Sequence, residues 1–139
     1  MKKKYNYIEK GKGVPILLLH GLMGAVSNFE STMETLPKHG FRVILPTLPL
    51  YELPIIKTNV NQLTIFIENF IKELNLPQIS ILGNSLGGHI GLLLALKQPE
   101  KINKLILSGS SGLYENTLGG KFPKRGNYNY IKNKTEEVF

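Results

Sequence analysis

The sequence predicts an α/β fold with a mostly parallel sheet, and three observations predict it. Short apolar runs recur at residues 14–19, 41–45, 79–82 and 102–107, each with the composition of a strand buried on both faces. Segments with helical periodicity lie between these runs. The third run passes through a glycine-rich turn directly into an apolar helix. Strands and helices are therefore expected to alternate along the chain.

The N-terminal third carries the shortest expected elements. Residues 4–8 alternate as a short edge strand does, and the Gly-Lys-Gly sequence at residues 11–13 forms a turn into the first buried strand. After that strand, Ser27 or Asn28 can cap a helix that ends near Gly40. The apolar face of this helix consists of Phe29, Met33 and Leu36.

A proline-rich loop and the longest helix follow the strand at residues 41–45. Residues 46–54 contain three prolines and several apolar side chains, which favours a loop that runs beside a site. Asn59 or Asn61 then starts an amphipathic helix that ends before Pro77. Its apolar stripe, expected to pack on the sheet, consists of Leu63, Phe66, Ile67, Phe70, Ile71 and Leu74.

Composition excludes several classes of function. The formal net charge is +7, but much of the excess lies near the two chain ends, so we expect solubility rather than nucleic-acid binding. The chain has no cysteine, which excludes disulfides, thiolate metal sites and a cysteine nucleophile. No apolar run is long enough to span a membrane, and residues 5–10 are too polar for a signal peptide. We expect a cytoplasmic location.

The chemistry centres on the sequence Gly83-Asn84-Ser85-Leu86-Gly87, which has the form G-x-S-x-G. A serine at the tip of a strand-to-helix turn has a strained backbone, which requires neighbours without a Cβ at close range. Gly83 and Gly87 meet this requirement. The following helix directs its N-terminal amides at whatever Ser85 attacks. Ser85 is therefore a candidate nucleophile, although such a turn can also pack tightly or hold a phosphate.

A second motif, His20-Gly21-Leu22-Met23-Gly24, follows the strand at residues 14–19. Together with the turn around Ser85, this motif resembles the α/β-hydrolase superfamily, in which an H-G-x-x-G loop precedes the nucleophile turn. About sixty residues separate the two motifs, which leaves room for the helix, strand, helix and strand between them. The order of the motifs and their predicted elements both fit the family.

The resemblance implies a three-layer αβα fold, truncated after the strand that follows the nucleophile helix. Residues 1–112 would form the N-terminal part of the core and residues 113–139 the start of a cap. The implied reaction is acyl transfer to water, with Ser85 as nucleophile and the backbone N–H groups of Leu22 and Leu86 as oxyanion hole. No metal and no cofactor is implied. The substrate is expected to be small and partly apolar, judging from Leu22, Met23, Leu48 and Leu50.

The remaining catalytic groups of the family are missing from this sequence. They follow the serine in the order Asp or Glu, then His, but the chain has no aspartate and no histidine after His89. His20 is expected to brace the oxyanion loop and His39 to lie on the surface or cap a helix. His89 lies one helical turn beyond Ser85, so we expect local packing or hydrogen bonding rather than catalysis. Glu115 could orient a base, but none follows it.

These observations favour the N-terminal part of a serine-dependent esterase-like hydrolase that is inactive as a 139-residue chain. Two alternatives stay open. The turn sequence Gly83 to His89 is similar to that of carbon–carbon bond hydrolases, which act on diketone-like acids. The missing triad partners favour instead a non-catalytic, hydrolase-like binding module.

Overall fold

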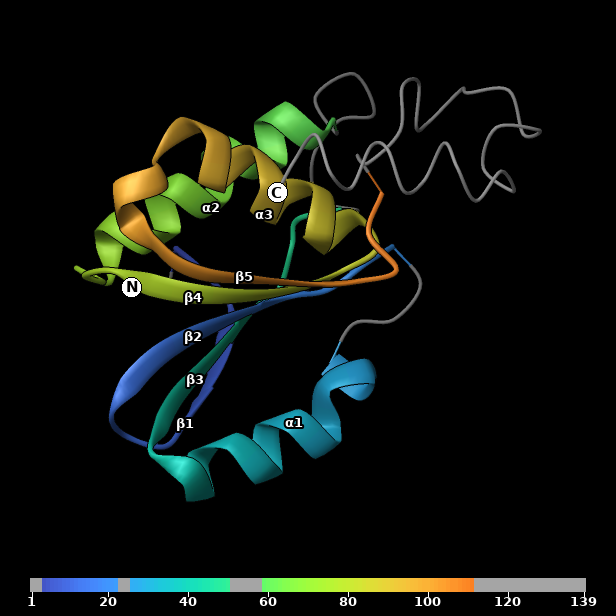
Figure 1. Ribbon diagram of the computed structural model, residues 1–139. Helices are drawn as coiled ribbons and strands as arrows, with labels where there is room; N and C mark the ends of the chain where they lie inside the picture. The colour runs from blue at the N-terminus through green and yellow to red at the C-terminus, as the bar shows by residue number, and fades with distance from the viewer. Residues whose placement is uncertain (1–3, 23–25, 51–58, 112–139) are drawn as a thin grey trace, which may run out of the picture.

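The computed structural model describes residues 4–22, 26–50 and 59–111, and these form a sheet between two helical layers (Figure 1). The five strands lie in the order β1-β3-β2-β4-β5, and only β1 is antiparallel to its neighbour. Helices α2 and α3 cover one face, and α1 covers the other (Figure 1). This arrangement confirms the predicted α/β fold with a mostly parallel sheet. The elements are β1 (Tyr7–Lys10), β2 (Val14–Leu19), α1 (Glu30–Thr35), β3 (Phe41–Pro46), α2 (Val60–Glu73), β4 (Ile79–Asn84), α3 (Leu86–Lys97) and β5 (Ile102–Ser108).

Strand β1 begins later than the sequence predicts, at Tyr7 rather than Lys4. Tyr5 is the reason, because its ring packs against the aromatic side chains of α2 instead of joining the sheet. The ring centroids of Tyr5 and Phe66 lie 5.1 Å apart, and those of Tyr5 and Phe70 lie 5.4 Å apart, both edge-to-face. The turn into β2 is confirmed, with positive φ values at Gly11 and Gly13.

Helix α1 is shorter than predicted at both ends, although the helical segment as a whole ends near Gly40 as predicted. Residues 26–29 form a 3₁₀ turn, so the α-helix begins only after Phe29, and no side chain caps it. The predicted cap by Ser27 or Asn28 is therefore wrong. A second 3₁₀ turn ends at Gly40, whose left-handed conformation (φ 82°) lets its N–H reach the carbonyl groups of Leu36 and Pro37.

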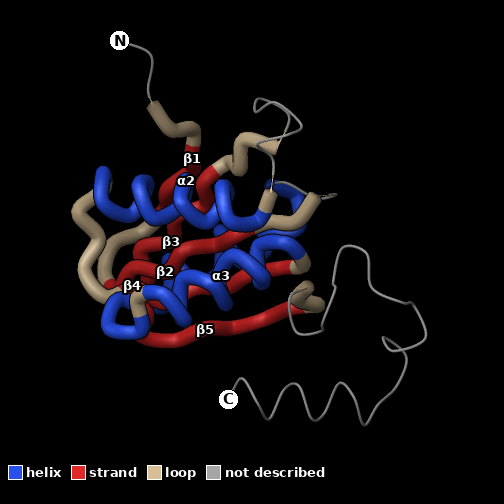
Figure 2. The backbone as a smooth tube through the Cα atoms, turned by 90° about the horizontal axis from the view of Figure 1, so that it is seen from above, coloured by secondary structure: helices blue, strands red, loops and turns tan. Residues whose placement is uncertain are grey.

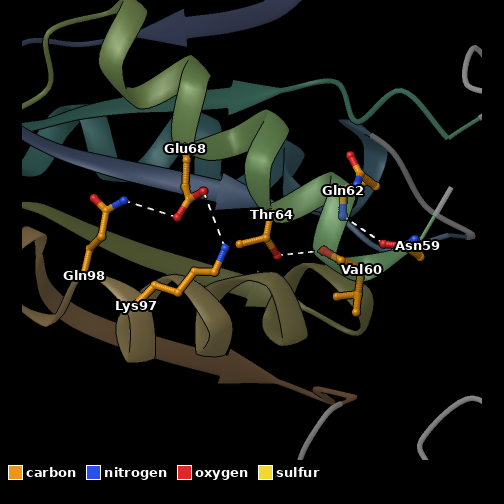
Figure 3. Close-up of polar contacts among 7 residues, drawn as sticks. All are labelled: Asn59, Val60, Gln62, Thr64, Glu68, Lys97 and Gln98. Atoms are coloured by element: carbon orange, nitrogen blue, oxygen red, sulfur yellow. Dashed lines mark hydrogen bonds and ion pairs between the residues drawn. The ribbon is translucent and has the colours of Figure 1, made fainter. Parts of the chain in front are cut away.

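Helix α2 starts where the asparagine predicts. The Asn59 side chain accepts a hydrogen bond of 2.9 Å from the N–H of Gln62, a regular N-cap (Figure 3). At the other end, Glu68 accepts a hydrogen bond from Gln98 (3.2 Å) and pairs with Lys97 (3.7 Å), which joins α2 to the end of α3 (Figure 3). The buried residues of α2 are Leu63, Thr64, Ile67, Phe70 and Ile71.

Strand β5 is less buried than its apolar sequence predicts. It lies at the edge of the described sheet and pairs only with β4 (Figure 2). None of its residues is buried, and Ile106 is 49% exposed. One face lies under α3, where Leu105 contacts Gly91, but α1 does not extend over the other face. The burial expected from the apolar residues of β5 is thus not observed, and β5 forms the exposed apolar edge expected of a fold that stops after this strand.

In the part of the chain that the structure describes, no helix combines the length and the apolar character that crossing a bilayer requires. The predicted division at residue 112 cannot be compared with the fold, because residues 113–139 lie outside the described part.

Candidate active site

Ser85 lies in the turn between β4 and α3 and has the strained backbone that the sequence predicts. Its φ of 52° and ψ of −115° are rare for a residue with a side chain, and such conformations cost on the order of 1–3 kcal/mol. A Cβ at Gly83 would lie 2.6 Å from the carbonyl oxygen of Gly87, and one at Gly87 would overlap the carbonyl of Leu19. The two glycines thus permit the turn, and the Ser85 residue is exposed.

His20 is buried at the carboxyl end of β2 and holds two loops together. Its Nε2 accepts a hydrogen bond of 3.0 Å from the N–H of Leu48, so this nitrogen carries no proton. Its Nδ1 therefore carries the hydrogen and donates to the carbonyl of Gly21 at 2.8 Å. The prediction that His20 braces the loop is confirmed, and both of its ring nitrogens are occupied.

The loop after β2 meets the Ser85 turn directly. A Cβ at Gly21 would lie 3.0 Å from the Cβ of Ser85, so the loop passes beside the serine. Leu22 is 52% exposed, whereas the Leu86 side chain is buried in the main core. Neither backbone N–H donates a hydrogen bond to another group of the described residues. Within the described part of the chain, these two N–H groups near Ser85 therefore have no acceptor.

The other histidines occupy different positions. His39 is exposed and precedes β3, so it lies at the opposite end of the sheet from Ser85. His89 lies on α3, and burial lowers the pKa of its ring below the ordinary value. The His89 Nδ1 atom is buried without a hydrogen-bond partner among the described residues. Packing of the ring is consistent with the prediction, whereas the predicted hydrogen bond is not observed for Nδ1 within the described part.

Residues 108–111 form a turn at the end of β5, and this turn is hydrogen-bonded to Ser85 and Asn84. The N–H of Ser85 donates to the carbonyl of Ser108 (3.1 Å), and the carbonyl of Ser85 accepts from the N–H of Ser111 (3.1 Å). The Asn84 side chain also donates to the carbonyl of Ser108 (3.1 Å). The contact of this turn with Ser85 was not predicted from the sequence. Its position after a strand parallel to β4 was an available signal, because the carboxyl ends of such strands share one edge.

The predicted substrate-binding side chains differ in exposure. Leu48 is only 3% exposed and belongs to the main core, so it offers little surface to a ligand. Leu50 is half-buried, and Met23 lies outside the described residues. Within residues 4–22, 26–50 and 59–111, no group of three or more His, Cys, Asp or Glu side chains could hold a metal ion.

Comparison with known families decides the family of the chain. A family model described as "alpha/beta hydrolase fold" matches residues 14–136. The chain belongs to the α/β-hydrolase fold family. The elements that carry Ser85 and His20 both lie inside the matched region.

Curated relatives of this α/β hydrolase include hydrolases named for 2-hydroxy-6-oxo-dienoic acids. One is a 2-hydroxy-6-oxo-6-(2'-aminophenyl)hexa-2,4-dienoic acid hydrolase of Metapseudomonas resinovorans, 36% identical over 77% of this chain and 39% of the relative. Another is a 2-hydroxy-6-oxononadienedioate/2-hydroxy-6-oxononatrienedioate hydrolase of Pseudomonas putida, 35% identical over 76% of this chain and 39% of the relative. The chain spans about two fifths of the length of these relatives.

Solved structures of similar fold include other hydrolases. An α/β hydrolase enzyme from the metagenome of sediments from the lagoon of Mar Chica is 36% identical, with a TM-score of 0.77, over 99% of this chain and 62% of that chain. A structure from work on carboxylesterases of Nitrososphaera gargenis is 25% identical, with a TM-score of 0.71, over 77% of this chain and 42% of that chain. These likenesses confirm the three-layer fold of this α/β hydrolase.

Proposed function

We propose that this chain supplies the nucleophile and the oxyanion hole of a hydrolase that cleaves carbon–carbon bonds in 2-hydroxy-6-oxo-dienoic acids. The strained, exposed Ser85 beside the His20 loop carries the proposal of serine chemistry. The substrates for which the two curated relatives are named support 2-hydroxy-6-oxo-dienoic acids as the substrate class. They favour carbon–carbon cleavage over the ester hydrolysis expected from the sequence.

In the proposed reaction, the Ser85 hydroxyl oxygen attacks the 6-oxo carbon of the substrate. The developing oxyanion would accept hydrogen bonds from the N–H groups of Leu22 and Leu86, which have no other acceptor among the described residues. When the tetrahedral intermediate collapses, the carbon–carbon bond breaks and its electron pair passes to the dienoate fragment, which takes up a proton. Water then hydrolyses the serine ester and releases a carboxylic acid.

The proposal requires a base that accepts the Ser85 proton. Both ring nitrogens of His20 are occupied, and His39 lies at the far end of the sheet. His89 lies one turn along α3 from the serine, and burial disfavours its charged form. We therefore assign the base to a histidine outside residues 1–139 and expect no turnover by the 139-residue chain alone.

A chimera tests this proposal. Residues 4–111 replace the matching segment of the Metapseudomonas resinovorans relative, so that the relative supplies the rest of the enzyme. We expect hydrolysis of 2-hydroxy-6-oxo-6-(2'-aminophenyl)hexa-2,4-dienoic acid, for which that relative is named, measured as loss of the dienoate absorbance. Ser85→Ala should reduce this hydrolysis by about 10³-fold or more. Ser108→Ala is the matched control, because only the backbone carbonyl of Ser108 contacts the Ser85 turn among the described residues.

The other outcomes identify other functions. Turnover of an aryl ester without turnover of the dienoate would overturn carbon–carbon cleavage and favour an esterase, the second candidate, which the carboxylesterase-like structure supports. A folded chimera with neither activity would favour a non-catalytic binding module. Dienoate hydrolysis that survives Ser85→Ala would remove the serine from the mechanism.

A further inference from the structure

The turn at residues 108–111 forms hydrogen bonds with both peptide groups that flank Ser85. The N–H of Ser85 belongs to the peptide group shared with Asn84, and it donates to the carbonyl of Ser108 at 3.1 Å. The carbonyl of Ser85 belongs to the next peptide group, and it accepts from the N–H of Ser111 at 3.1 Å and from the Ser111 hydroxyl at 3.4 Å. Because φ and ψ are the rotations of these two planes about one Cα, the turn holds both angles of Ser85.

The second of these peptide groups also carries the N–H of Leu86. A peptide group is planar, so a hydrogen bond that fixes its carbonyl also fixes the direction of its N–H. Bonds accepted by the carbonyl also polarise the N–H of the same group. The other donors to this carbonyl, the N–H groups of Gly88 (3.1 Å) and His89 (3.3 Å), belong to α3 itself. Among the described residues, Ser111 is therefore the donor outside α3 that holds this peptide group, and it connects the group to the end of β5.

Close packing keeps the turn against the helix. A Cβ at Gly88 would lie 2.6 Å from the Cβ of Ser110, so only a glycine allows the two to approach. The Ser110 side chain is nearly buried, and its hydroxyl donates to the carbonyl of Ser111 at 2.7 Å. Gly109 has a φ of 54°, which lets the chain reverse after β5. The position of the Ser111 N–H is thus set by contacts on several sides.

We propose that Ser111 is a positioning residue that aims the Leu86 N–H at the oxyanion through the shared peptide group. This inference rests on the proposed function for its catalytic meaning. Its structural content, a hydrogen bond that controls the Leu86 amide, stands on the geometry alone and can be measured without turnover. Ser111 contacts neither the substrate nor the reacting atoms in this role.

Nuclear magnetic resonance of the isotope-labelled 139-residue chain tests the structural content. We expect a scalar coupling across the hydrogen bond between the Ser111 nitrogen and the Ser85 carbonyl carbon, with couplings across the hydrogen bonds between β2 and β4 as internal reference. Replacing the Ser111 amide by a backbone ester removes its N–H and keeps its side chain. That ester should shift the Leu86 amide nitrogen signal, because it removes a hydrogen bond that polarises the same peptide group.

A matched ester at Ser110 is the control, because the Ser110 N–H donates to no acceptor among the described residues. Absence of the coupling while the reference couplings are present would overturn the proposal, as would equal effects of the two esters on Leu86. Ser111→Ala keeps the N–H and should change the Leu86 signal less than the Ser111 ester does.

The chimera supplies a second readout. We expect the Ser111 ester to lower kcat about tenfold with KM within about twofold, part of the 10²–10³ loss typical of removing an oxyanion donor. The Ser110 ester should change kcat less than about twofold. An equal loss from both esters would overturn the positioning role even in an active enzyme. An inactive chimera whose parent chain shows the coupling would instead refute the proposed function and leave the control of the Leu86 amide intact.

Discussion

The three histidines differ more by surroundings than by sequence. His20 exchanges hydrogen bonds with two loops, His39 is exposed, and the His89 ring is partly buried on α3. The sequence predicted the first two roles, because an H-G-x-x-G loop and a helix end are local features. The His89 Nδ1 atom has no hydrogen-bond partner in the part of the chain that the structure describes, and this depends on which groups pack against it rather than on a local sequence pattern.

The lowered pKa of His89 predicts how stability depends on pH. The unfolded chain binds a proton at His89 near the ordinary pKa of about 6.5, while the folded chain binds it only at lower pH. The free energy of unfolding should therefore fall as pH drops below about 6.5. His89→Gln should flatten this dependence in urea titrations between pH 5 and pH 8. His39→Gln should leave it as in the wild type, and an unchanged slope in His89→Gln would contradict the assignment.

At the scale of elements, close approach of backbones decides where α3 can lie. A side chain at Gly87 would overlap the carbonyl of Leu19, and neither backbone can retreat without moving β2 or α3. Gly87→Ala should therefore lower the free energy of unfolding by about 1–3 kcal/mol or more. Gly91→Ala is a control in the same helix, because its Cβ would meet side chains rather than backbone: the flexible end of Leu105 at 2.8 Å and the Cγ2 of Ile81 at 3.2 Å.

Helix propensity partly offsets those contacts in Gly91→Ala, which should change stability by less than about 1 kcal/mol. Urea unfolding of both variants measures the difference. If both variants lose the same free energy of unfolding, the close approach of Gly87 to β2 does not explain the effect of Gly87→Ala.

Element boundaries were predictable where a local hydrogen bond sets them. Asn59 caps α2 and Gly40 ends the segment after α1, and both are visible in the sequence. The start of α1 was not, because a 3₁₀ turn displaced the cap. The apolar residues of β5 alone predicted burial, and its exposure followed only from the expectation that the fold stops after this strand.

At the scale of the whole molecule, β5 leaves an apolar edge on the described sheet. Ile106 is 49% exposed on a strand that pairs only with β4, and such edges promote association between chains. Ile106→Lys should reduce the self-association of the 139-residue chain at high concentration, measured by sedimentation velocity. Its stability should stay within about 0.5 kcal/mol of the wild type, because the position is half exposed.

Leu96→Lys separates an edge effect from a loss of apolar surface. Leu96 is 74% exposed and belongs to α3, so its substitution leaves the side chains of the edge strand unchanged. It should leave self-association nearly unchanged. If both lysine variants suppress association equally, surface hydrophobicity rather than the strand edge is responsible.

The hydrogen bonds between residues 108–111 and Ser85 also have a consequence during protein synthesis. The ribosome releases residue 85 before these residues, so the strained peptide has no partner outside α3 until β5 has emerged and joined β4. Up to that moment the serine can relax to an ordinary conformation and is no better aligned than any surface serine. Ser85 therefore acquires its native hydrogen bonds only when the strand after α3 has joined the sheet.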